Sequence, residues 1–294
     1  MRLNYISQIK SKLKKSVVIG TKRPSVNILD GSYISVYKGR SLNFEDLREY
    51  VPGDDVKDID WKASARSNTT LVREFIAEKK HNLMFVMDTN KRMLGETSEG
   101  KEKYQVALYA AGTLAYMVSR NGDYISSVYN DGRSIKYHPF KSGLMNIEKI
   151  LEEYAKSVTY SNTSDISASL EYIMRNIRRR MIIVIVTDME GKRTISEQTL
   201  RRLSVLHDVL MMDITDTDAS GKSIYDVDSG MILPDFFTTD RKLLKREAAR
   251  KAQIEKESET KLKKTGVVLG KFSDTEGVDI GITELLAKHK LEKK

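Results

Sequence analysis

The feature that most constrains the fold is an apolar run, M-I-I-V-I-V-T-D, at residues 181–188. A short run rich in β-branched residues and closed by a polar one predicts a strand that is buried on both faces. Two other runs have the same character: L-M-F-V-M-D at 83–88 and L-H-D-V-L-M-M-D at 206–213. Segments with helical periodicity separate them. The pattern therefore predicts an α/β fold with a doubly wound, mostly parallel, Rossmann-like sheet.

The rest of the chain divides around this sheet. Further strands are expected at residues 123–129, 133–138 and 266–272, and helices at about residues 102–119, 143–156, 165–179, 239–264 and 282–290. These elements assign the α/β domain to residues 81–294. Residues 24–80 contain short alternating stretches, such as S-V-N-I-L at 25–29 and Y-I-S-V-Y at 33–37, punctuated by turn residues. They predict a small β-rich extension that packs on the larger domain.

Composition excludes several classes of site. The chain has no cysteine, so disulfides, thiolate zinc sites and a cysteine nucleophile are excluded, and its four histidines are scattered. The longest uncharged run, residues 104–119, falls short of the ~20 residues that span a bilayer. No secretory signal is evident. We expect a cytoplasmic protein that is not an enzyme and needs no cofactor.

Positive charge is concentrated at the N-terminus. Residues 1–29 supply seven of the nine net positive charges, since they hold seven lysines and arginines and no acidic residue. The near-neutral remainder argues against nucleic-acid binding. Within residues 1–23, apolar positions recur every three or four residues between lysines, which predicts a basic amphipathic helix.

This helix has two readings. It either docks on its own domain with its lysines in solvent, or attaches to an acidic partner or to an anionic membrane at the inner face. The alternative function for the whole chain is therefore that of a peripheral membrane-surface or nucleic-acid-binding protein acting through residues 1–23.

Three expected strands end in aspartate, at Asp88, Asp188 and Asp213. Ligands of doubly wound sheets bind beyond the C-terminal ends of the strands, and paired carboxylates there suit a hard cation such as Mg²⁺. We expect the binding face at this edge, around the three aspartates and Ser164.

The arrangement resembles the von Willebrand factor A domain. In that family the first strand ends in D-x-S-x-S, a second loop gives a threonine and a later strand ends in aspartate, which together form the metal-ion-dependent adhesion site. Here D-T-N-K-R at 88–92 keeps Asp88 and places Asn90 and Arg92 at the serine positions. The resemblance implies that Ser164 or Thr163 is the second-loop ligand and Asp188 the last carboxylate.

Arg92 makes this metal site degenerate. A guanidinium has no acceptor atom, and at ~4 Å from a divalent ion the repulsion is about 8 kcal/mol at an effective dielectric of 20. Either Arg92 points away, or it replaces the metal as the cation between Asp88 and Asp188. Mg²⁺ stays as the alternative occupant. A second acidic stretch, D-T-D-A-S-G at 216–221, begins like a calcium loop but has Val227 at its twelfth position, so we set it aside.

An acidic turn precedes the only tryptophan of the chain. In Y-V-P-G-D-D-V-K-D-I-D-W, residues 50–61, Pro52-Gly53 predicts a tight turn, and Asp54 and Asp55 are placed to accept backbone N–H bonds or to cap a helix. Ile59 and Trp61 alternate with two aspartates, so we expect an apolar face and an acidic face, the latter paired with Arg48, Lys57, Lys62 or Arg66. The stretch is a structural clasp, a partner-binding surface, or a metal or catalytic site.

The longer stretch R-E-Y-V-P-G-D-D-V-K-D-I-D-W-K-A-S-A-R, residues 48–66, is similar to the signature of the domain-of-unknown-function family number 58. That resemblance implies a von Willebrand A-like domain after the signature, and a bacterial protein that partners a MoxR-type AAA+ ATPase in the assembly or maturation of other proteins. The signature residues are Tyr50, Pro52, Gly53, Asp54, Asp55, Asp60, Trp61 and Arg66.

Overall fold

The computed structural model describes residues 4–19, 43–76, 80–120, 122–217, 225–227, 230–232 and 240–292. The chain forms two compact units, one made of residues 1–32 together with 81–294 and the other of residues 33–80. The strands expected at 25–29 and 33–37 lie outside the described residues.

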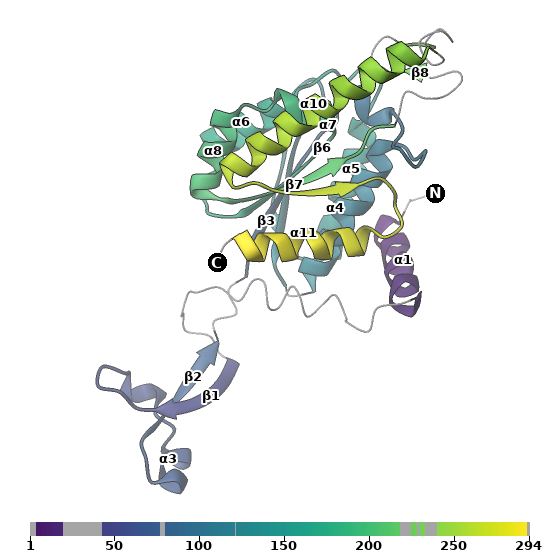
Figure 1. Ribbon diagram of the computed structural model, residues 1–294. Coiled ribbons are helices and arrows are strands. Elements are labelled where there is room, and N and C mark those ends of the chain that lie inside the picture. The colour runs from purple at the N-terminus through teal and green to yellow at the C-terminus, as the bar shows by residue number, and fades with distance from the viewer. Residues whose placement is uncertain are drawn as a thin grey trace. The chain divides into compact units, whose positions relative to one another are not determined.

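The larger unit is built on a six-stranded sheet with the order β10-β7-β6-β3-β4-β5 (Figure 1). All neighbouring strands are parallel except β5, which runs antiparallel to β4 at the edge. The expected mostly parallel sheet is therefore confirmed. Its strands are β3 (Asn82–Met87), β4 (Tyr124–Asn130), β5 (Ile135–Lys141), β6 (Ile182–Thr187), β7 (Asp208–Ile214) and β10 (Val268–Phe272).

Helices cover both faces of the sheet (Figure 1). One face carries α1 (Tyr5–Ile19), α4 (Lys103–Ser119), α5 (Leu144–Ser157) and α11 (Val278–Glu292). The other carries α6 (Ile166–Asn176), α7 (Met189–Thr194), α8 (Glu197–Leu206) and α10 (Arg241–Thr265). A short hairpin, β8 (Tyr225–Asp226) and β9 (Met231–Ile232), precedes α10.

The core explains why the apolar runs of the sequence predicted strands. Every residue of β6 is buried, as a central strand covered on both faces requires. Helix α4 is buried around most of its circumference, because it lies between the sheet and the helices α1, α5 and α11. This packing places Lys103, the first residue of α4, at the C-terminal edge of the sheet. Among the described residues, no helix is both long and apolar enough to cross a membrane.

Helix α1 packs on α4 and α5. Ile6 and Ile9 on its apolar side are buried, and the carboxylate of Glu148 in α5 accepts the backbone N–H groups of Tyr5 and Ile6 at 2.7 and 2.9 Å. A carboxylate at a helix N-terminus satisfies otherwise unpaired donors and the helix dipole. Lys12 of α1 also lies over the ring of Tyr109 in α4, 4.3 Å from the centroid. The apolar side of the described helix is thus already in contact with its own unit.

The smaller unit consists of an antiparallel pair, β1 (Asn43–Glu49) and β2 (Leu71–Ile76), with the acidic turn between them. The turn contains a 3₁₀ helix, η1 (Val56–Asp58), and a two-turn helix, α3 (Trp61–Ser67). Two strands and two short helices bury little apolar surface, and a lone hairpin is only marginally stable. Its turn therefore depends on polar contacts.

Candidate functional site

The site lies where the strand order of the sheet reverses. Strands β3 and β6 are neighbours, yet the chain leaves β3 for β4 on the opposite side. Asp88 and Asp188 directly follow β3 and β6, and both are buried. Doubly wound sheets bind their ligands at this switch point. The two aspartates therefore lie together at the edge of the sheet where the sequence predicted them.

Asp88 is held on both carboxylate oxygens. Its Oδ1 accepts the backbone N–H of Asn90 at 3.0 Å, and its Oδ2 accepts the hydroxyl of Thr187 at 2.7 Å. The buried hydroxyl of Tyr154 donates to the backbone carbonyl of Asp88 at 3.1 Å. Burial, and then the charge of Asp188, raise the pKa of Asp88 to about 6.

Asp188 caps helix α7, and its Oδ1 accepts the backbone N–H of Gly191 at 2.9 Å. No side chain fits at Gly191, because a Cβ there would lie 1.9 Å from the Thr187 hydroxyl and 2.6 Å from Asp88 Oδ2. The glycine lets the first turn of α7 close directly over the two carboxylates.

Lys103 supplies the nearest cation. Its buried ammonium donates to Asp188 Oδ2 at 2.8 Å and also to Asp216. Burial alone would raise the pKa of Asp188, but Lys103, and next Arg92, outweigh it and hold that pKa below its ordinary value. Burial alone would lower the pKa of Lys103, but the charges of Asp188 and Asp216 raise it above its ordinary value. Asp188 and Lys103 are therefore both charged at neutral pH.

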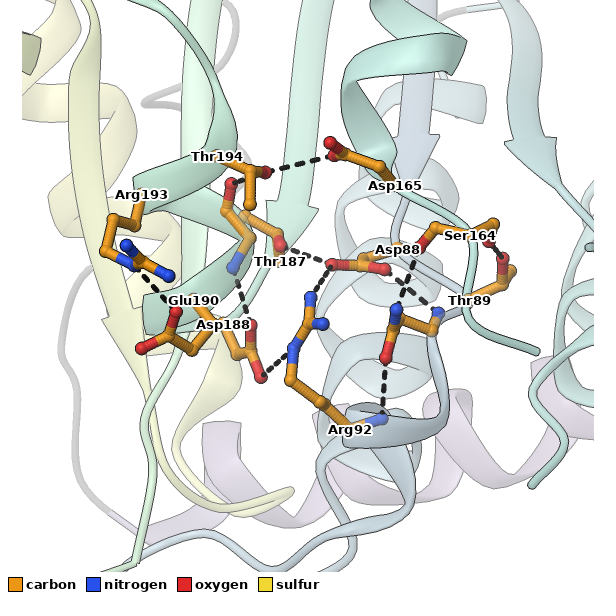
Figure 2. Close-up of polar contacts among 12 residues, drawn as sticks. Asp88, Thr89, Arg92, Ser164, Asp165, Thr187, Asp188, Glu190, Arg193 and Thr194 are labelled. Carbon is orange, nitrogen blue, oxygen red and sulfur yellow. Dashed lines mark hydrogen bonds and ion pairs between the residues drawn. The ribbon is translucent and has the colours of Figure 1, made fainter. Parts of the chain in front are cut away.

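Arg92 occupies the position between the two carboxylates (Figure 2). Its Nη2 lies 3.9 Å from Asp88 Oδ2 and its Nε 3.8 Å from Asp188 Oδ2. These distances are too long for hydrogen bonds, so the contribution is an ion-pair attraction. The residue sits on the 3₁₀ helix η2 (Lys91–Leu94), whose N-cap Asn90 accepts the Arg92 backbone N–H at 3.0 Å. Of the two placements expected for Arg92, the structure has the one between Asp88 and Asp188.

Asn90 and Ser164 join the loop after β3 to the loop before α6. The amide of Asn90 donates to the carbonyl of Ser164 at 2.9 Å, and the Ser164 hydroxyl donates to Asn130 O at 3.0 Å. The Thr89 hydroxyl also donates to Asn130 O. All four candidate ligands, Asp88, Asn90, Ser164 and Asp188, therefore lie at one edge.

These residues do not fit a divalent metal ion. Every carboxylate oxygen of Asp88 and Asp188 already accepts a hydrogen bond, and so does the amide oxygen of Asn90. Lys103 and Arg92 add two positive charges, each of which would repel a divalent ion ~4 Å away by about 8 kcal/mol at an effective dielectric of 20. Within the described ranges, no group of three or more histidine, aspartate or glutamate side chains is placed to hold a metal ion.

Asp213 belongs to a separate cluster of charged side chains, which it forms with Lys192 and Glu255. It lies within β7, opposite Thr187, and its Oδ2 accepts the buried ammonium of Lys192. The same ammonium donates to Glu255 in α10 at 2.8 Å. Burial raises the pKa of Asp213 to about 6. Asp213 therefore ties α7 and α10 to the sheet and is too buried to face a partner.

Polar side chains that are exposed or partly exposed surround the buried carboxylates and form what we call the rim: Ser164, Asp165, Glu190, Arg193 and Thr194 (Figure 2). Arg193 Nε pairs with Glu190 at 2.7 Å, and the Thr194 hydroxyl donates to Asp165 at 3.0 Å. The Thr194–Asp165 bond joins the end of α7 to the start of α6, and the rim carries both signs of charge.

In the smaller unit, the aspartates of the acidic turn bind the turn itself. Asp54 forms a two-pronged pair with Arg48 at 2.6 and 2.7 Å and accepts the Val51 N–H at 2.9 Å. Asp55 caps η1 through the Lys57 N–H at 3.1 Å, and Gly53 has a φ of 111°. The expected tight turn and backbone capping are confirmed.

The alternation expected for Ile59 and Trp61 was wrong. Asp60 is the N-cap of α3 and accepts the backbone N–H groups of Lys62 and Ala63, so Trp61 starts a helix instead of continuing a strand. Ile59 is buried, whereas Trp61 is 67% exposed. Asp60 pairs with Arg73 at 3.0 Å, which was not among the expected cations. Lys57, Lys62 and Arg66 are exposed, as are Tyr50 and Pro52.

Residues 46–221, more than half of the chain, match the family described as "Protein of unknown function DUF58". The chain belongs to the DUF58 family.

Its relatives include two mycobacterial proteins. The DUF58 chain is 24% identical over 226 residues to "Uncharacterized protein Rv1480" of Mycobacterium tuberculosis and to "Uncharacterized protein Mb1516" of Mycobacterium bovis. Each match covers 74% of this chain and 71% of the relative.

Solved structures that align with this one include the conserved hypothetical protein BatB from Bacteroides thetaiotaomicron. The alignment has a TM-score of 0.44 and 13% sequence identity, and it covers 71% of this chain and 98% of that one. An aerotolerance-related membrane protein from Bacteroides fragilis follows at a TM-score of 0.43, with 13% identity, covering 71% and 99%.

Two charged residues of the DUF58 site were not expected from the sequence. Lys103 lies fifteen positions after Asp88, and Asp216 lies in the stretch set aside as an incomplete calcium loop. A lysine in the first turn of an otherwise uncharged helix was the available signal, because the positive end of the helix dipole disfavours a cation there.

Proposed function

We propose that this DUF58 chain is a non-enzymatic protein-interaction or adaptor protein with a von Willebrand A-like domain and a degenerate metal-ion-dependent adhesion site. One observation carries the proposal: the charged groups at the switch point are paired with one another. Asp88 and Asp188 are bonded on every carboxylate oxygen, and Lys103 and Arg92 neutralise them. Groups engaged in this way are poorly placed for acid–base or nucleophilic work on a substrate.

The rim is the surface that we assign to partner binding. It corrects the expected binding face, since Asp88, Asp188 and Asp213 are buried and only side chains around them reach solvent. By the family resemblance, the partner is a MoxR-type AAA+ ATPase acting in the assembly or maturation of other proteins in the cytoplasm. A mixed-charge rim supports recognition through complementary charge.

The test compares two charge swaps that preserve net charge. Glu190→Lys with Arg193→Glu reverses the polarity of the rim pair. The matched control, Glu171→Arg with Arg175→Glu, reverses an exposed pair in the second half of α6, whose first half begins at the rim residue Asp165. Binding of the purified full-length chain to the MoxR-type ATPase of the same genome is measured with ATP present, and melting temperatures check folding.

We expect the rim swap to weaken binding by roughly tenfold or more, because opposed like charges cost several kcal/mol. The control swap should change it by about twofold or less. Absence of binding by the wild-type chain at micromolar concentration would overturn the proposed partner. Equal effects of both swaps would overturn the rim as the binding face.

The alternative, attachment to membranes or nucleic acid through residues 1–23, ranks second because Ile6 and Ile9 pack on α4 and α5. Liposome and nucleic-acid binding by the full-length chain and by a chain lacking residues 1–23 separates the two functions. Loss of such binding on truncation, with no ATPase association in either protein, would favour the alternative.

A further inference from the structure

Lys103 holds an unusual position for a lysine. It is the first residue of α4, where the partial positive charge of the helix N-terminus disfavours a cation, and its side chain is only 6% exposed. An ammonium that has been taken out of water is strongly unfavourable unless carboxylates pair with it. Asp188 and Asp216 accept its hydrogen bonds from two different loops, one after β6 and one after β7. The ammonium thus holds acidic groups from two strand ends, as a coordinated ion does.

Lys103 and Arg92 contribute differently. Both cations reach Asp188 Oδ2, Lys103 at 2.8 Å and Arg92 at 3.8 Å. Only the lysine is within hydrogen-bond distance, so it fixes the geometry, while the guanidinium adds attraction and reaches across to Asp88. Together they carry two positive charges, the same charge that one divalent ion would bring.

We propose that Lys103 is the built-in cation of this edge: with Arg92, it holds the strand-end carboxylates in the place of a divalent metal ion, so that the edge is assembled by the chain alone and does not respond to divalent ions. The inference deepens the proposed function, since it concerns the same edge, and it makes any partner binding there independent of metal.

The test asks whether removing the two cations creates an ion response. The wild-type full-length chain is compared with Lys103→Met, Arg92→Ser and the double variant. Arg92→Ser restores an oxygen at the last position of the 88–92 motif. Lys101→Met is the matched control, because Lys101 is an exposed lysine two residues before Lys103. Melting temperatures are measured with a chelator, with millimolar MgCl₂ or MnCl₂, and with NaCl of equal ionic strength.

We expect no saturable shift of the wild-type melting temperature with either divalent ion. Lys103→Met should lower it by about 6 to 20 °C in chelator, as loss of one partner of a buried ion pair does, and Lys101→Met should have little effect. The double variant should regain part of its loss with MgCl₂ or MnCl₂ in a saturable manner. Adding Asp188→Asn to the double variant should abolish that recovery.

Two results would overturn the proposal. One is a saturable divalent-ion shift in the wild type that disappears in Asp188→Asn. The other is a folded double variant with no ion response. If the double variant does not fold, the single variants decide: a larger loss for Arg92→Ser than for Lys103→Met would contradict the leading role of the lysine. None of these readouts involves a partner, so failure here is distinguishable from failure of the adaptor role.

Discussion

Lys103 at the start of α4 donates a hydrogen bond across 2.8 Å to Asp188 at the end of β6, and so ties the most buried helix to the switch point of the sheet. The same lysine also donates a hydrogen bond to Asp216 in the loop after β7. Because Lys103 and Arg92 of the same chain neutralise the aspartates, the net charge of this edge depends on the protonation of its own side chains. That property can be tested by pH.

Asp88 should make the protein more stable in mild acid than at neutral pH. Its folded-state pKa is about 6, above the ordinary value of 3.8, so the folded state binds a proton before the unfolded state as pH falls. The stability gained between about pH 6 and pH 4 is on the order of 3 kcal/mol. Asp88→Asn removes this titration, so its stability relative to wild type should be greatest at neutral pH and should decline towards about pH 4.5.

Chemical denaturation of both proteins across this range gives the measurement. Asp213, whose pKa is also about 6, is present in both and cancels in the difference. An unchanged difference between the two proteins at all pH values would contradict the assigned burial of the Asp88 charge.

Lys192→Met should destabilise the larger unit strongly. The ammonium is buried and donates to Asp213 and Glu255, and removing it leaves a buried carboxylate unpaired, which typically costs about 3 to 5 kcal/mol. Arg193→Met is the matched control, since its exposed pair with Glu190 is worth about 1 kcal/mol or less. Equal losses in the two variants, measured by urea unfolding, would be incompatible with this packing.

The sequence predicted the sheet well because its strands are buried on both faces. Runs such as 83–88 and 181–188 have no polar interruption, and the rule that ligands gather at strand ends then located Asp88 and Asp188. Element ends were less predictable. Helix α11 begins at Val278, four residues before the expected start, because Val278 packs into the core.

The partners of these aspartates could not be predicted in the same way. A lysine usually indicates a solvated surface, so Lys103 carried little weight without knowing that α4 is buried on most sides. At Trp61, four alternating residues suited a strand and a helix start equally. Asp60 as N-cap decided for the helix, and local hydrogen bonds overrode the apolar pattern.

Asp60→Ala should loosen α3 alone. The substitution removes the acceptor for the Lys62 and Ala63 N–H groups and the partner of Arg73. Hydrogen exchange of the amides of α3 should accelerate by roughly fivefold, the usual effect of a lost N-cap, with no change in the six-stranded sheet. Asp58→Ala is the control within the same turn, since Asp58 caps no helix. Equal acceleration by both variants would show that the turn does not depend on its caps.

Glu148→Ala should release the N-terminus of α1. The carboxylate accepts two backbone N–H groups of α1, and its loss leaves both donors without their acceptor and weakens the favourable interaction with the helix dipole. Glu152→Ala, one turn later in α5, is the matched control. Hydrogen exchange of residues 5–9 should rise in Glu148→Ala and stay unchanged in Glu152→Ala. If the freed helix then binds anionic vesicles that the wild type ignores, docking on α4 and α5 is what withholds its apolar side from membranes; unchanged exchange in Glu148→Ala would contradict the capping role.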